Sequence, residues 1–121
     1  MANILIVDSY LSIGLLYREV LQEQGHCVFV TVSGKEALLL GLHENIDIAV
    51  VDDRLPDFDA DGLLRRLKKL QPQMLGVLSV SSTFGLPANP GSWDAFFLKS
   101  NDFRILEAEI ERLWRESSIA A

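Results

Sequence analysis

The sequence predicts an α/β domain with a parallel sheet covered by helices on both faces. Short apolar runs alternate with amphipathic stretches along the whole chain. The runs are rich in β-branched residues and too short for helices, which indicates strands buried on both faces. The stretches between them place apolar residues at helical spacing. This alternation of strands and helices is typical of a parallel sheet.

Each element is predicted from its own pattern. The strands are expected at 4–7, 27–32, 46–51, 75–80 and 95–98. Helices are predicted from four stripes of apolar positions: Ile13, Leu16, Tyr17, Val20 and Leu21; Ala37, Leu38, Gly41 and Leu42; Leu63, Leu64, Leu67 and Leu70; Phe103, Leu106, Ile110 and Leu113. Gly25 supplies a stop for the first helix, and Ser33 with Glu36 forms a capping box for the second.

The connection between the last two strands breaks the pattern. Residues 81–93 contain two prolines and two glycines, which exclude a normal helix. We expect an irregular segment there, with Phe84, Leu86 or Trp93 covering the sheet. Residues 117–121 show no pattern and are expected to form a disordered tail, so the domain covers 1–116.

Length and composition limit the function. The chain has 121 residues, 49% of them hydrophobic, which suits one domain with one core. Cys27 is the only cysteine; we expect it to be buried, and a free thiol indicates a reducing compartment. The formal charge of −6 disfavours nucleic-acid binding. No apolar run approaches the roughly 18 residues that span a bilayer, so we expect a cytoplasmic protein that binds no membrane.

Polar side chains follow four of the five predicted strands. Because the carboxyl ends of parallel strands meet at one edge of a sheet, these side chains are expected to gather there. They are Asp8 and Ser9, Asp52 and Asp53, Ser81, and Lys99. Acids, a hydroxyl and an amine at one edge suit a divalent cation and a phosphoryl group.

At these residues the chain resembles the receiver domain of two-component response regulators, the chemotaxis-regulator type. Residues 4–8 resemble the acidic first-strand motif of that family. Residues 47–56, with Asp61-Gly62 after them, resemble its phosphoacceptor motif, in which an aspartate is followed by two residues, an apolar residue and proline. Residues 97–99 resemble its lysine strand, and the resemblance covers nearly the whole chain.

The resemblance implies a fold and a function. The fold is a doubly wound five-stranded parallel sheet of the flavodoxin-like type, in the order 2-1-3-4-5, with the helix between strands four and five missing or reduced. Asp52 would accept a phosphoryl group from a histidine kinase or a phosphotransfer protein, and a conformational change would signal to a downstream protein. Such a domain is not an enzyme in the turnover sense, and a homodimer is a further state that the family suggests.

The resemblance also assigns roles at the site. Asp8, Asp52 and the backbone carbonyl of Arg54 would hold Mg²⁺, with Asp53 as an additional candidate ligand. Lys99 would pair with a phosphoryl oxygen. The switch residues would be Ser81, through its hydroxyl, and Phe96, through its ring.

Several residues depart from the family pattern. Ser9 replaces a second acid, so Mg²⁺ binding should be weak. Asp53, or the loop acids Asp57, Asp59 and Asp61, restore the charge if the backbone turns them inward; otherwise the loop acids keep their loop solvated. The Arg54 guanidinium either pairs with Asp52, blocks the site or lies in solvent. The loop after Pro56 is two residues longer than usual, and Ser100 replaces a proline.

Two functions therefore stay open. The first is the phosphoacceptor; the second is a degenerate receiver that binds proteins independently of phosphorylation. Ser9, Arg54 and the missing helix favour the second, and so would Lys99 or Arg54 filling the space beside Asp52. A flavodoxin-type cofactor binder would need a phosphate loop that residues 9–14 do not supply. His26, His43 and Trp114 receive no role.

Overall fold

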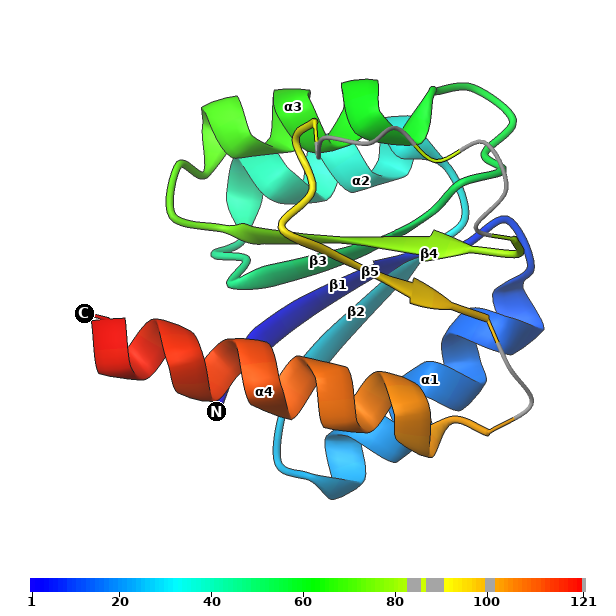
Figure 1. The fold of residues 1–121 in the computed structure, drawn as a ribbon. Helices are drawn as coiled ribbons and strands as arrows, with labels where there is room; N and C mark the ends of the chain where they lie inside the picture. The colour runs from blue at the N-terminus through cyan, green and yellow to red at the C-terminus, as the bar shows by residue number, and fades with distance from the viewer. Residues whose placement is uncertain (83–85, 87–90, 100–101, 121) are drawn as a thin grey trace.

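The computed structural model describes residues 1–82, 86, 91–99 and 102–120 and shows one parallel sheet between two layers of helices (Figure 1). The elements are β1 (Asn3–Val7), α1 (Leu11–Glu23), β2 (Cys27–Thr31), α2 (Gly34–His43), β3 (Ile48–Asp52), α3 (Ala60–Leu70), β4 (Leu75–Val80), β5 (Ala95–Leu98) and α4 (Arg104–Ala120). The predicted fold class is confirmed.

The five strands lie in the order β2-β1-β3-β4-β5, as predicted, and all neighbours are parallel. Each of the first three strands is followed by a helix that crosses over the sheet. Pairing brings Val7 opposite Val51 and Asp52 opposite Ser79. The carboxyl ends of β1, β3, β4 and β5 therefore meet at one edge, where the polar residues follow them.

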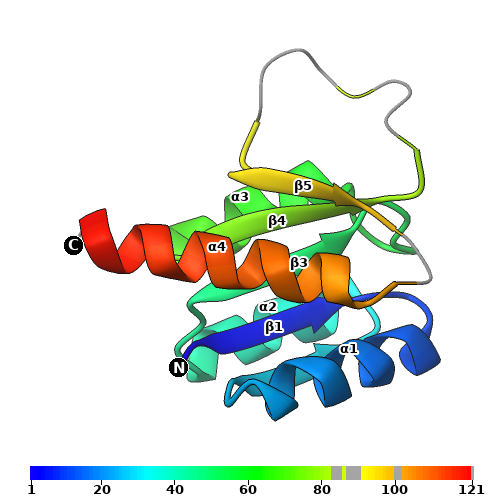
Figure 2. The same ribbon diagram turned by 60° about the horizontal axis from the view of Figure 1, so that its bottom comes forward.

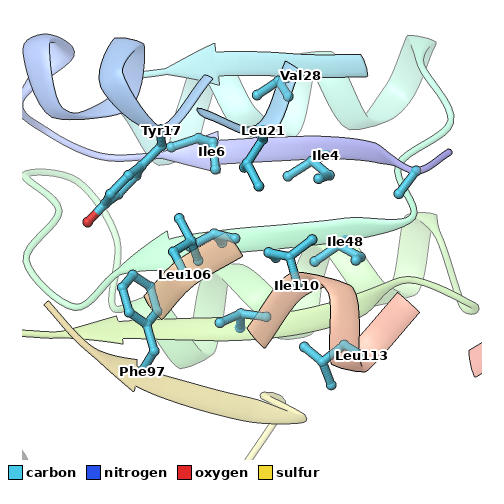
Figure 3. Packing of buried hydrophobic residues seen from close by; sticks show 13 residues of the cluster. Ile4, Ile6, Tyr17, Leu21, Val28, Ile48, Phe97, Leu106, Ile110 and Leu113 are labelled. Atoms are coloured by element: carbon cyan, nitrogen blue, oxygen red, sulfur yellow. The ribbon is translucent and has the colours of Figure 1, made fainter. Parts of the chain in front are cut away.

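The two faces of the sheet bury different helices (Figures 1 and 2). Strand residues alternate between the faces, so Ile4 and Ile6 of β1 face α1 and α4, while Leu5 and Val7 face α2 and α3. Figure 3 shows the first of these cores, called here the α1–α4 core. Its buried residues are Ala2, Ile4, Ile6, Tyr17, Leu21, Val28, Ile48, Val50, Val77, Phe97, Leu106, Ile110 and Leu113.

Some predicted stripe residues are exposed. Leu16, Leu42 and Leu70 point to solvent, because helices on a doubly wound sheet bury only a narrow stripe. Helix α1 packs closely against β2 at Gly14, where a Cβ would lie 2.6 Å from Val30 Cγ1. The prediction of a buried cysteine was also wrong, since Cys27 begins the edge strand and is exposed.

His26, which received no role from the sequence, joins the start of β1 to α4. Its Nδ1 accepts the backbone N–H of Ala2 at 3.0 Å, and its Nε2 lies 2.6 Å from Oε1 of Glu111. This contact lies at the amino end of β1, away from the polar edge. His26 is thus a buried structural residue, and the sequence offers no pattern that reveals the pairing across the fold.

Helix α4 extends past the point where the sequence places a disordered tail. The helix runs to Ala120. Arg112 pairs with Glu109 one turn before it and with Glu116 one turn after it, the latter at 3.0 Å. The hydroxyl of Ser117 donates to the carbonyl of Trp114 at 2.9 Å. These contacts along one side of the helix favour helical backbone beyond the apolar stripe.

The connection between β4 and β5 contains no helix in its described residues, which are 81–82, 86 and 91–94. Leu86 and Trp93 pack against the core beneath α2 and α3, as predicted, while Phe84 lies outside the described residues. Within the described part of the chain, no helix has the length and apolar character needed to cross a membrane.

The end of this connection is fixed to α3 by carboxylates. Asp94 Oδ2 accepts from the backbone N–H of Gly76 and from Lys68 Nζ, both at 2.7 Å. Asp61 Oδ1, in the first turn of α3, accepts the backbone N–H of Ser92 at 2.5 Å. Side-chain contacts thus hold the segment that leads into β5 and to Lys99.

Candidate functional site

Three of the predicted site residues meet at the polar edge of the sheet. Asp8 follows β1, Asp52 ends β3 and Lys99 follows β5. Lys99 Nζ lies 2.8 Å from Asp52 Oδ1 and 3.5 Å from Asp8 Oδ2. The ammonium group therefore bridges two carboxylates that come from separate strands.

Both carboxylates are enclosed. Asp8 and Asp52 are 2% and 1% exposed, whereas the Lys99 side chain is 23% exposed and covers them. The backbone N–H of Tyr10 donates to Asp8 Oδ1 at 2.9 Å, and that of Arg54 donates to Asp52 Oδ1 at 3.2 Å. Each carboxylate is thus held by the turn that follows its own strand.

The charges of these groups depend on one another. Burial raises the pKa of Asp8 above 3.8, and the charge of Asp52 adds to this; the Tyr10 N–H and Lys99 act in the opposite direction. Burial opposes the charge of Lys99, but the hydrogen bonds and charges of Asp52 and Asp8 outweigh it and raise the Lys99 pKa above 10.5. Lys99 is therefore a fixed cation at neutral pH.

Asp53 and Ser81 approach the site in a different way than the sequence predicts. Burial and the hydrogen-bonded Asp52 carboxylate raise the pKa of Asp53, whose carboxyl also accepts the backbone N–H of Ser81. An additional acid therefore lies beside Asp52. Ser81 contributes through its backbone, and as a residue it is exposed.

Arg54 and Phe96 point outward. Arg54 is exposed, and among the described residues its guanidinium forms no ion pair, because Lys99 takes the Asp52 carboxylate instead. The alternative in which Arg54 pairs with Asp52 is therefore not the one observed. Phe96 is also exposed, with its ring edge-on to Trp93 at a centroid distance of 5.7 Å.

The loop acids do not restore charge at the site. Asp57 accepts the backbone N–H groups of Gly34 and Lys35 at 2.9 and 3.0 Å, so it binds the amino end of α2. Asp59 is the N-cap of α3, and Asp61 holds the connection before β5. The idea that these acids turn inward was wrong, because unpaired N–H groups at two helix ends and in the connection compete for them.

Replacing Asp57 by Ala is expected to lower the free energy of unfolding by about 1 kcal/mol, the usual effect of losing a helix cap. The contacts with Gly34 and Lys35 lower the Asp57 pKa below 3.8. The stabilisation is therefore present above pH 3.8 and lost as pH falls through the lower folded pKa. Urea unfolding of both proteins at pH 7 and pH 3 measures this; equal stabilities at pH 7 would contradict it.

Tyr17 is a neighbour of the site, although the sequence marks it only as part of an apolar stripe. It is buried in the α1–α4 core, edge-on to Phe97 and Phe103 at centroid distances of 6.2 and 5.3 Å. Its phenol oxygen points toward the carboxyl ends of the strands (Figure 3). Burial, with the charges of Asp8 and Asp52, raises its pKa to about 12.

This shift predicts a loss of stability at alkaline pH. An unfolded phenol ionises near pH 10.0 and Tyr17 in the folded chain near 12, so the folded state retains the proton between these values and loses stability as pH rises through them. The Tyr17 contribution amounts to about 2–3 kcal/mol. The raised pKa of Lys99 also makes the folded state lose stability as pH rises above 10.5. The test therefore compares the alkaline stability of wild type with that of Tyr17→Phe. Parallel curves for the two proteins would rule out the shift.

Comparison with solved structures identifies the architecture. A CheY-like response regulator receiver domain protein from Methanospirillum hungatei JF-1 superimposes with a TM-score of 0.87 over 100% of this chain and 99% of that chain, at 24% identity. The chain has the fold of response regulator receiver domains. The resemblance expected from the sequence is thereby confirmed. No protein-family model matches the chain.

Another solved structure and one curated protein are also similar to the chain. The response regulator TrrA of Thermotoga maritima, solved in complex with the histidine kinase ThkA, gives a TM-score of 0.82 and 25% identity over 93% of this chain and 98% of that chain. Sporulation initiation phosphotransferase F of Bacillus subtilis is 34% identical over 66 residues, 54% of this chain and 53% of that protein. The alignment thus spans about half the length of this curated relative.

Proposed function

We propose that this receiver-fold chain accepts a phosphoryl group on Asp52 from a histidine kinase or phosphotransfer protein and signals by conformational change. The observation that supports this most strongly is the buried Asp52 carboxylate at the carboxyl edge of the sheet, with the Lys99 ammonium 2.8 Å away. A fixed cation beside a nucleophilic carboxylate suits a reaction that brings in negative charge. The complex of TrrA with a histidine kinase supports the choice of partner.

The geometry favours Oδ1 of Asp52 as the reacting oxygen. Oδ2 is enclosed, whereas Oδ1 faces the partly exposed Lys99. Oδ1 attacks the phosphorus atom, the bond from phosphorus to the donor nitrogen breaks, and the donor imidazole keeps the electron pair. Lys99 then turns from the carboxylate to a phosphoryl oxygen, while the Arg54 N–H stays at Asp52.

The side chains suit weak Mg²⁺ binding. Asp8, Asp52, the backbone carbonyl of Arg54 and the nearby Asp53 offer the oxygen ligands that Mg²⁺ prefers. Within the described residues, however, no three acidic, histidine or cysteine side chains are already arranged to hold a metal, and Lys99 lies between Asp8 and Asp52. A bound Mg²⁺ would neutralise charge on the transferred group. A related structure of TrrA was solved in complex with Mg(2+)-BeF.

The proposed output is a change at Ser81 and Phe96. The Ser81 backbone already contacts the Asp53 carboxyl, so this segment senses the site directly. Phe96 is held outward against Trp93. Movement of Ser81 toward the phosphoryl group would free space for Phe96, and the altered surface would be recognised by a downstream protein in the cytoplasm or by a second copy of the chain.

The test is incubation of the protein with a small phosphodonor and Mg²⁺, followed by intact-mass measurement and peptide mapping. We expect one phosphoryl group per chain, attached to Asp52. Absence of an adduct at high Mg²⁺ would overturn the proposal.

A second candidate is a degenerate receiver that binds its partner without phosphorylation. The observation that favours it is the covering of Asp52, which is 1% exposed beneath Lys99. This function predicts that partner binding is the same with and without phosphodonor. The partly exposed Lys99 contacts Asp52 through Oδ1, so a phosphodonor that draws Lys99 away would approach this oxygen, and for this reason we place the phosphoacceptor first.

A further inference from the structure

Two buried side-chain oxygens in the described residues have no hydrogen-bond partner. They are Oδ2 of Asp52 and Oγ of Ser79. The two residues are 1% and 2% exposed. Burying a polar atom without a partner carries its full desolvation penalty, so folded proteins contain few such atoms, and each calls for an explanation.

The two unpaired atoms lie beside each other. Asp52 and Ser79 are direct partners in the parallel pairing of β3 with β4. Val50 and Val77, two residues before each, both face the α1–α4 core, so Asp52 and Ser79 share that face. Neighbouring strands are about 4.8 Å apart. The unpaired carboxylate oxygen and the unpaired hydroxyl therefore belong to one location.

This location is bounded by apolar side chains on the β5 side, while the Asp53 carboxyl lies beside Asp52. On its other side Ser79 is the pairing partner of Phe97, and the Phe97 ring meets Tyr17. Lys99 occupies the other oxygen of Asp52. Oδ2 can only accept hydrogen bonds, whereas a serine hydroxyl can both donate and accept. A water molecule can donate to the first and accept from the second, which gives it the minimum of two polar partners.

We propose that Asp52 Oδ2 and Ser79 Oγ together bind one enclosed water molecule, which makes Ser79 a positioning residue for the Asp52 carboxylate. The water satisfies both unpaired atoms at once. The sequence suggests a hydroxyl role for Ser81 and none for Ser79.

The role in positioning rests on the proposed function. With Oδ2 held by the water, and Oδ1 held by Lys99 and the Arg54 N–H, the carboxylate has one fixed orientation. Oδ1 then faces the side from which a phosphodonor arrives. Fixing the reacting atom in this way speeds a reaction without changing how tightly the donor binds.

The water site is tested by crystal structures of wild type and Ser79→Ala at a resolution that shows ordered water. We expect one density peak within hydrogen-bond distance of both Asp52 Oδ2 and Ser79 Oγ, and no such peak in the variant. An empty site in wild type, a direct bond between the two side chains, or the same peak retained in Ser79→Ala would overturn the proposal. This readout does not depend on phosphorylation, so a bridging water in a protein that takes no phosphoryl group would refute the proposed function alone.

The positioning role is tested by kinetics with a small phosphodonor. Ser79→Ala should lower the maximal phosphorylation rate about fivefold and leave the half-saturating donor concentration unchanged. The matched control is Thr31→Val, which removes another buried strand hydroxyl, one that donates to the Ile6 carbonyl at 3.2 Å. We expect the control to lower stability and leave the rate unchanged. An equal fall in both variants would show that Ser79 acts only through stability and would overturn its positioning role.

Discussion

Replacing Asp52 by Asn is expected to abolish uptake of a phosphoryl group. The substitution keeps the size of the side chain but removes the charged oxygen that attacks phosphorus. It also removes the carboxylate that holds Lys99 at 2.8 Å. Intact-mass measurement after incubation with phosphodonor should show no adduct. An adduct of wild-type size in Asp52→Asn would place the reacting group elsewhere.

Asp47→Asn is the matched control for this experiment. Asp47 lies directly before β3, at the opposite end of the strand from Asp52, and its Oδ2 accepts the Asn3 N–H at 2.7 Å. Its loss is expected to lower stability and to leave phosphoryl uptake intact. The pair of variants therefore separates loss of the acceptor from a general effect of removing an acid next to this strand.

Replacing Lys99 by Met is expected to have the largest effect on stability. The Asp8 and Asp52 carboxylates would then be buried without their cation, and breaking such a pair costs about 3 kcal/mol. Burial already raises the pKa of Asp8 above 3.8. Without Lys99 this pKa should rise further, so the folded variant takes up protons more readily than the unfolded chain. The stability difference from wild type should therefore be full near pH 7 and shrink as pH falls toward 4.

Lys68→Met provides the comparison for Lys99. Lys68 also lies 2.7 Å from a carboxylate, Asp94, but both side chains of that pair are partly exposed. We expect a loss of about 1 kcal/mol or less. The Lys99 variant should also react with phosphodonor about a hundredfold more slowly, because it lacks the group that stabilises the transferred charge. Equal effects of the two substitutions on stability would show that the site is not a buried charge cluster.

The sequence was sufficient for the order and most bounds of the elements. Strand 75–80 matches β4, in which both faces are buried, as a continuous apolar run predicts. Strand 95–98 matches β5 as well, although Phe96 and Leu98 of this edge strand are exposed. The sequence also predicted that Asp8, Asp52 and Lys99 lie together, since all three stand at the carboxyl ends of strands that share one edge. The exposed Leu16 and Leu42 show where periodicity fails, because it does not give the width of the buried stripe.

The direction of side chains in loops was not predictable in this way. The sequence left Asp57 either turned toward the site or in solvent, and only the fold shows that the α2 N–H groups bind it. The sequence left the Arg54 guanidinium paired with Asp52, blocking the site or in solvent, because the competition of Lys99 for Asp52 depends on distances between strands. Ser79 illustrates the same limit, since its position opposite Asp52 comes from the pairing register of β3 and β4.

A crystal structure of the wild-type protein with Mg²⁺ and beryllofluoride would show whether Asp8, Asp52 and Lys99 form a site for a tetrahedral anionic group. We expect beryllium bonded to Asp52 Oδ1, with Lys99 Nζ moved from the carboxylate to a fluoride. If Lys99 is still 2.8 Å from Asp52 Oδ1, as it is without ligand, and no beryllofluoride lies beside it at saturating concentration, these residues do not form such a site.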